Sequence, residues 1–189
     1  GGVFDRLIQA SELKHDSVRT LIKKGYLSDF KCYSLPERLN ASALKVGNSD
    51  YTYKTLEHET RKVVFAMVGD AVHHYRRLAA GKQAIAVCVS IQIAIKTAER
   101  FKQANIPAAA IHSQMSAVEV ARIFDLFEKR HIKVLCNVDM IGEGVDVPAI
   151  ECLIMMRKTA SFGLYRQWIG RSLRPEPNKP HAILIDHVG

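Results

Sequence analysis

The sequence of 189 residues predicts an α/β fold with an open, mainly parallel sheet and helices on both faces. Short, almost continuously apolar runs recur along the chain, and stretches with helical periodicity separate them. Strands of parallel sheets have this composition because helices cover both of their faces. The runs are AIAVCVS (84–90), AAAIH (108–112), IKVLCNV (132–138), IECLIM (150–155) and AILID (182–186).

Two helices are predicted before the first run. Asp16 begins a short helix that ends near Gly25. Residues 55–80 form either one long helix or two helices broken at Gly69. Between these two segments, the Pro and Gly of residues 34–54 indicate an irregular connection.

A further helix is predicted over residues 117–129, between the second and third runs. Ser116 and Glu119 have the spacing of a capping box, in which each side chain accepts a hydrogen bond from the other residue's backbone N–H. The apolar residues that follow at helical spacing are Val120, Ile123, Phe124 and Phe127.

Composition narrows the class of protein and of partner. The chain has 27 Lys and Arg against 19 Asp and Glu, and this excess favours a polyanionic partner such as nucleic acid over a merely solvated basic surface. The four cysteines form no C-x-x-C pair, so we expect reduced thiols in a cytoplasmic protein and no metal site. No apolar run approaches the ~18 residues of a membrane span, and no signal peptide is visible, so no membrane association is expected.

The segment QWIGRSLRP near the C-terminus predicts a helix with two different faces. At about 100° per residue, Tyr165, Ile169 and Leu173 form an apolar side. The two arginines of the other side lie one turn apart with no acidic residue beside them, which indicates either an anionic ligand or a solvated basic face. The residues of that other side are Gln167, Gly170, Arg171 and Arg174.

The segment VLCNVDMIGEGVDVP (134–148) places glycines and an acidic residue after a predicted strand. Ligands bind at strand ends in open parallel sheets, and Gly142 and Gly144 would let backbone amides approach an anion. Asp146 could accept hydrogen bonds from a sugar hydroxyl. The alternative is an ordinary turn with a solvated Asp, because G-x-G alone is a weak signal.

Together these two segments resemble motifs V and VI of the C-terminal RecA-like lobe of superfamily 2 helicases and translocases. QWIGRSLR resembles motif VI, Q-x-x-G-R-x-x-R, and AIAVCVS resembles the motif IV strand. The order and spacing agree over residues 82–187. The opening residues resemble the connector that follows the first lobe in DEAD/DEAH-type helicases of phages and bacteria. We therefore divide the chain into residues 1–54, an inter-lobe connector with an N-terminal helical segment, and residues 55–189, a RecA-like helicase C-terminal domain.

The resemblance implies roles for individual residues. Arg174 and Arg171 would contact the terminal phosphate of ATP, with Gln167 orienting them, and Asp146 would contact the ribose beside Gly142, Glu143 and Gly144. Gln167 in place of His, and Glu143 before Gly144, look more like the DNA-repair and restriction branches than the DEAD-box RNA branch. DNA is therefore favoured over RNA as the partner.

Residues after two predicted strands are candidates for contacts with the nucleic-acid backbone. Each of them is polar and lies at the carboxyl end of a strand, although each is also an ordinary loop residue. Val138 replaces a Thr that is common in motif V, so one hydroxyl contact is missing. The candidates are Ser90, Gln92, His112, Ser113 and Gln114.

The chain contains neither G-x-x-x-x-G-K-[ST] nor D-E-x-H. In the resembled family these elements lie on the first RecA-like lobe and hold most of the ATP and Mg²⁺, so this chain would provide half of an active site. We expect the full-length protein to be an ATP-dependent helicase and the isolated fragment to be inactive. The alternatives are a non-catalytic nucleic-acid-binding RecA-like module and a dinucleotide-binding oxidoreductase domain, although the latter requires G-x-G-x-x-G after its first strand.

Overall fold

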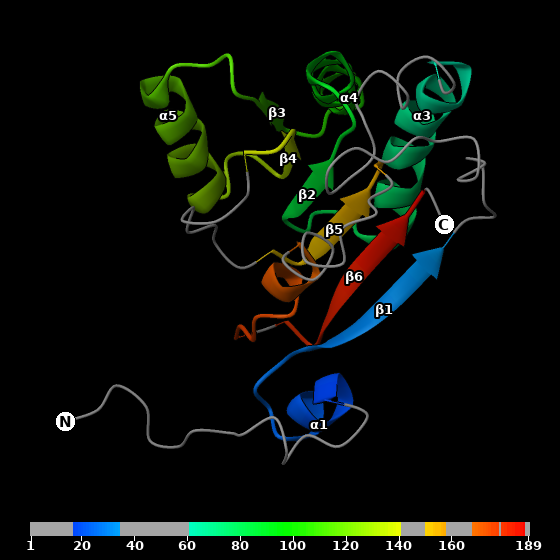
Figure 1. Cartoon of the computed structure of the whole chain (residues 1–189), viewed down its shortest axis with the longest axis vertical. Coiled ribbons are helices and arrows are strands. Elements are labelled where there is room, and N and C mark those ends of the chain that lie inside the picture. Colours follow the sequence, from blue (N-terminus) through cyan, green and yellow to red (C-terminus); the bar gives the residue numbers. More distant parts are fainter. Residues whose placement is uncertain (1–16, 35–60, 141–149, 158–167, 178, 188–189) are drawn as a thin grey trace, which may run out of the picture.

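The computed structural model describes residues 17–34, 61–140, 150–157, 168–177 and 179–187. Within these residues, six strands form one sheet in which every pairing is parallel, in the order β1-β6-β5-β2-β4-β3 (Figure 1). The strands are β1 Asp29–Ser34, β2 Ala84–Val87, β3 Ala108–Ile111, β4 Val134–Asn137, β5 Cys152–Met155 and β6 His181–Asp186.

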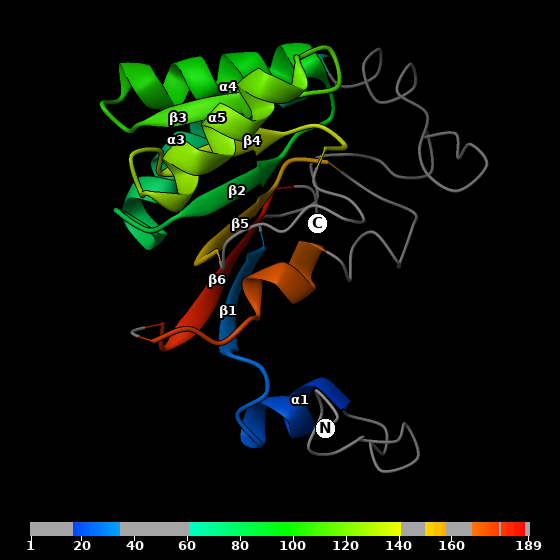
Figure 2. The same cartoon turned by 90° about the vertical axis from the view of Figure 1, so that its left-hand side faces the viewer.

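Helices cover both faces of this sheet, as Figures 1 and 2 show. Helices α3 and α4 pack against one face, in a hydrophobic cluster that includes Tyr75 and Phe101. The rings of these two residues meet edge to face, with their centroids 5.5 Å apart. Helix α5 and the helical residues 168–172 pack against the other face, with Phe127 and Trp168 in a second hydrophobic cluster. The helices are α1 Ser17–Lys23, α3 Arg61–Leu78, α4 Ile91–Gln103 and α5 Ala117–Glu128. This architecture confirms the predicted fold class.

Each of the five apolar runs contains a strand, although the strands are mostly shorter than the runs. The predicted capping box is present at the start of α5, where Ser116 and Glu119 exchange hydrogen bonds, and α5 ends at Glu128, one residue before the predicted end. Gly69 lies inside one continuous helix, α3, so the first of the two alternatives for that segment holds. The short N-terminal helix begins at Ser17, beside the expected Asp16, and α1 lies beyond the sheet at the amino end of β1 (Figure 2).

Strand β1 is not among the predicted runs. It lies within residues 1–54 and pairs along its whole length with β6, from Asp29 opposite His181 to Ser34 opposite Asp186. All six of its residues are exposed. The apolar criterion missed it because a strand at the edge of a sheet with uncovered faces has no need of apolar side chains. The predicted boundary between residues 54 and 55 lies outside the described residues.

The cysteines of the described residues are all free thiols. Cys88, Cys136 and Cys152 are buried in or beside the strands, and burial raises the pKa of the Cys136 thiol well above its usual range. Among the described helices, none is long and apolar enough to cross a membrane. The described residues also contain no group of three or more His, Cys, Asp or Glu side chains that could hold a metal ion.

Candidate functional site

The carboxyl ends of the parallel strands form one edge of the sheet, and the five candidates for nucleic-acid contact lie there. Ser90 follows β2 and is buried, and its hydroxyl caps α4 by accepting a hydrogen bond from Ile93 N–H (3.2 Å). Gln92 is exposed in the first turn of α4. The remaining candidates follow β3. In the sheet, β4 lies between β2 and β3. They are His112, which is partly exposed, and Ser113 and Gln114, which are exposed.

The turn that leaves β4 is fixed by side chains at the same edge. Asn137 is buried, and its Oδ1 accepts a hydrogen bond from Met140 N–H at 2.9 Å. Asp139 has a φ of 52°, and its Oδ1 lies 2.5 Å from Arg157 Nη1. Arg157 follows β5, so this ion pair passes over the end of β2, which lies between β4 and β5. The strand order, which the sequence does not display, brings these two charges together.

The predicted glycine-rich turn begins directly after this ion pair. Gly142, Glu143, Gly144 and Asp146 lie outside the described residues, and so does Gln167. Their roles in nucleotide contact therefore stay predictions. The structure instead defines the strand end from which the first four of these residues continue.

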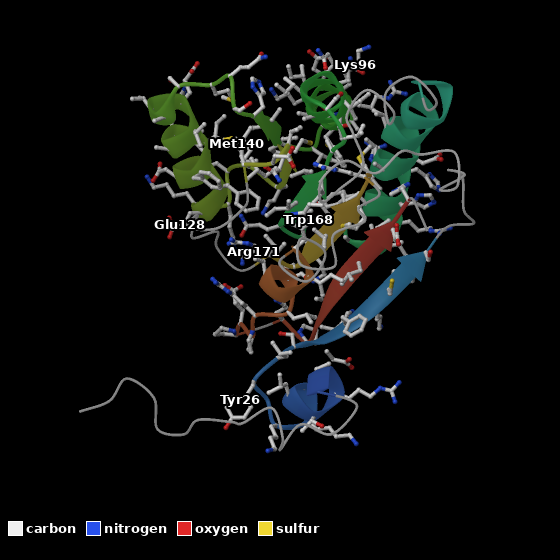
Figure 3. The ribbon with its side chains drawn as sticks, in the orientation of Figure 1. Tyr26, Lys96, Glu128, Met140, Trp168 and Arg171 are labelled. Carbon is white, nitrogen blue, oxygen red and sulfur yellow. The ribbon has the colours of Figure 1, made fainter. Side chains whose placement is uncertain are left out.

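Arg171 and Arg174 lie on a segment that we call the arginine turn, residues 168–174, which is helical over 168–172. Trp168 and Leu173 are buried against the sheet face that also carries α5. Arg171 is partly exposed and Arg174 is exposed. Of the predicted apolar side, Leu173 is buried and Ile169 is partly buried against the same cluster, whereas Tyr165 lies outside the described residues. Figure 3 shows Trp168 and Arg171 on this turn.

Gly170 is exposed on the arginine turn beside Arg171. A Cβ atom built at this position would meet nothing within 4 Å, and the residue does not have the positive φ that would require glycine. Glycine inside a helix costs about 1 kcal/mol relative to alanine. Neither the backbone nor the packing of the described residues therefore accounts for a glycine at this position. The missing side chain leaves open space next to Arg171 and Arg174.

A charge network stabilises the opposite end of the sheet, where the strands begin. The Glu151 carboxylate accepts hydrogen bonds from Gln83 N–H (3.0 Å), Lys82 Nζ (3.3 Å) and Arg130 Nη1 (3.2 Å). Burial raises the pKa of Glu151, but the hydrogen bond from Gln83 and the charges of Lys82 and Arg130 outweigh burial and hold this pKa below its ordinary value. The network joins the starts of β2 and β5 to the loop after α5.

Comparison with known proteins agrees with this fold. The family described as helicase conserved C-terminal domain matches residues 64–176. The chain is 35% identical over 172 residues to a 51.5 kDa protein of a Lactococcus phage (isolate 7-9), and the match covers 91% of this chain and 37% of that protein. The chain therefore spans little more than a third of this relative's length.

Two solved structures share the fold. The C-terminal domain of the DEAD-box protein Dbp5 has a TM-score of 0.54 and 20% identity, over 65% of this chain and 71% of that chain. The ATP-dependent Type ISP restriction-modification enzyme LlaBIII, solved bound to DNA, has a TM-score of 0.62 and 17% identity, over 89% of this chain and 12% of that chain.

The all-parallel sheet with helices on both faces defines a RecA-like domain of the kind found in helicase C-terminal lobes. Because the family match covers more than half of the chain, this chain belongs to the helicase conserved C-terminal domain family. The predicted resemblance to helicase C-terminal lobes is thereby confirmed.

Proposed function

We propose that this chain is the second lobe of an ATP-dependent helicase or translocase and completes an ATP site between two lobes. The observation that carries the proposal is the arginine turn, where Arg171 and Arg174 lie beside the open space at Gly170. The first RecA-like lobe would come from a part of the polypeptide outside these 189 residues. The phage relative, of which the chain covers 37%, is long enough to contain such a lobe.

The chemistry assigned to the arginine turn is stabilisation of charge on the terminal phosphate. In phosphoryl transfer the protein mainly positions groups and neutralises developing charge, and an arginine supplied from a facing surface contributes about 10³–10⁵ in rate. Arg174 and Arg171 would donate hydrogen bonds to the phosphate oxygens, and Gln167 would orient them. Planar guanidinium groups suit this task because they present several donors in a fixed fork.

The remaining nucleotide contacts would come from the turn after β4. Asp146 would accept hydrogen bonds from the ribose, and the backbone of Gly142, Glu143 and Gly144 would lie along the nucleotide. The ion pair between Asp139 and Arg157 supports this assignment, because it fixes the strand end from which the turn starts. Mg²⁺ would be held mainly by the first lobe.

The nucleic-acid backbone would bind at the carboxyl edge of the sheet. Gln92, Ser113 and Gln114 are exposed there, with His112 partly exposed beside them. Ser90 would act indirectly, because its hydroxyl orders the first turn of α4, whose backbone N–H groups suit a phosphate. The excess of basic residues favours a polyanion, and the DNA-bound state of the structurally similar LlaBIII supports DNA as the track.

The test is Arg174→Ala in the complete two-lobe polypeptide, with Arg77→Ala as the matched control. Arg77 is an exposed arginine on α3, which covers the other face of the sheet. Arg174→Ala should lower kcat for ATP by about 10³-fold or more, while ATP binding changes little and Arg77→Ala retains full activity. Unchanged hydrolysis in Arg174→Ala would exclude the phosphate-contacting role. A complete parent polypeptide that binds nucleic acid without hydrolysing ATP would favour the non-catalytic module.

A further inference from the structure

The arginine turn ends in backbone carbonyl groups that a helix cannot satisfy by itself. Lys179, on the segment that leads into β6, reaches three carbonyl oxygens with its ammonium group. Lys179 Nζ lies 2.7 Å from Ser172 O, 2.5 Å from Arg174 O and 3.1 Å from Ile150 O. The ammonium group therefore joins the end of the arginine turn to the start of β5.

Ser28, which lies between α1 and β1, binds the same turn from a second side. Its backbone N–H donates to Leu173 O at 2.8 Å, and its hydroxyl donates to Arg174 O at 3.2 Å. Arg174 O thus accepts hydrogen bonds from both Lys179 and Ser28. We call these donors, Lys179 Nζ together with Ser28 N–H and Oγ, the carbonyl clamp.

Lys179 is unusual because it is only 7% exposed. Lysine is almost never buried to this extent without a partner, because removing an ammonium group from water is costly. Burial lowers the pKa of Lys179, and the more distant charges of Glu176 and Glu151 partly oppose this effect. Within the described residues, the hydrogen bonds of this ammonium group go to carbonyl oxygens only, which leaves the cation dedicated to holding backbone.

We propose that Lys179 is a positioning residue for Arg174. The carbonyl clamp fixes the backbone of Arg174 and of the two residues before it, so the guanidinium group starts from one defined direction. A displacement of about 1 Å in a catalytic group can cost about 10²-fold in rate. This inference rests on the proposed role of Arg174 and adds the means by which the fold aims it.

The main experiment replaces Lys179 by Met in the complete polypeptide, with Lys102→Met as the matched control. Met keeps most of the volume of Lys179 but donates no hydrogen bond, and Lys102 is an exposed lysine on α4. Lys179→Met should lower kcat by about 10- to 100-fold and change KM for ATP less than about twofold, because ground-state binding is conserved. Lys102→Met should behave as the parent.

A second measurement separates positioning from general destabilisation. ADP with aluminium fluoride mimics the transferring phosphate, so its affinity reports the donors aimed at that group, whereas ADP alone does not. Lys179→Met should weaken binding of the fluoride complex by the factor lost in kcat and leave ADP affinity unchanged. A variant that is merely less stable would lose both affinities together or neither.

If Lys179→Met does not fold, Ser28→Ala tests the same role of the carbonyl clamp. This variant removes one donor to Arg174 O and keeps the N–H bond to Leu173 O, so a smaller loss in kcat of about two- to fivefold is expected, again with ADP affinity unchanged. Parent-like kcat and fluoride affinity in every folded clamp variant would overturn the positioning role. If Arg174→Ala itself hydrolyses ATP normally, the proposed function fails instead, which is a distinguishable result.

Discussion

Replacing Gly170 by Ala should move stability and activity in opposite directions. A Cβ at this position meets nothing within 4 Å, so the substitution carries no steric cost in the chain itself. Alanine is favoured over glycine in a helix by about 0.5–1 kcal/mol. For a domain of this size, 1 kcal/mol shifts Tm by roughly 2–4 °C, so Gly170→Ala should raise Tm of the 189-residue chain by about 1–4 °C.

In the complete polypeptide the same methyl group should lower kcat/KM for ATP by about tenfold or more, because it would fill part of the open space beside Arg171 and Arg174, where the phosphate would bind under the proposed function. Gly81→Ala is the matched control. Its Cβ also meets open space, but its φ of 77° disfavours any side chain. That control should lose about 1 kcal/mol of stability and keep its specific activity. Full activity in Gly170→Ala would refute the close approach, and a lower Tm would refute the packing argument.

Three further predictions concern the framework of the site. Ser116→Ala removes the capping box of α5 and should lower the free energy of unfolding in urea by about 1 kcal/mol, whereas Ser113→Ala, in an exposed turn, should not. Glu151→Gln should destabilise the chain at pH 7. The pKa of Glu151 in the folded chain lies below its ordinary value of 4.5, so the stability that its charge provides is lost as the pH falls through the folded pKa. The difference in free energy of unfolding between Glu151→Gln and the parent should therefore shrink below about pH 4.5. Urea titrations at several pH values would measure this difference. Asp139→Val places a β-branched residue at a φ of 52° and removes the ion pair with Arg157, so it should lower Tm measurably. Asp139→Asn should retain most of the stability, because Asn tolerates this backbone conformation.

The sequence predicted the buried part of the fold because burial dictates composition. Each apolar run contains a strand, and Ser116 and Glu119 form the expected cap. Strand β1 escaped prediction because its residues are exposed at the edge, and its place is set by pairing with β6 about 150 positions further along.

Long-range contacts around the site were not predictable for a related reason. The two faces of the arginine turn followed from helical periodicity, which is local. The ion pair of Asp139 with Arg157 depends on which strand lies between β4 and β5. The contacts of Lys179 and Ser28 with the arginine turn likewise join segments that only the folded sheet brings together.

The claim that this chain provides half of an ATP site is tested most directly by comparing ATP hydrolysis by the 189-residue chain and by the complete polypeptide, at equal concentration and with DNA present. We expect steady-state turnover by the complete polypeptide and none by the chain alone, because Arg171 and Arg174 would contact the phosphate of ATP without holding the nucleotide. Turnover by the purified chain alone, abolished by Arg174→Ala in that same chain, would show that these 189 residues contain a complete ATP site.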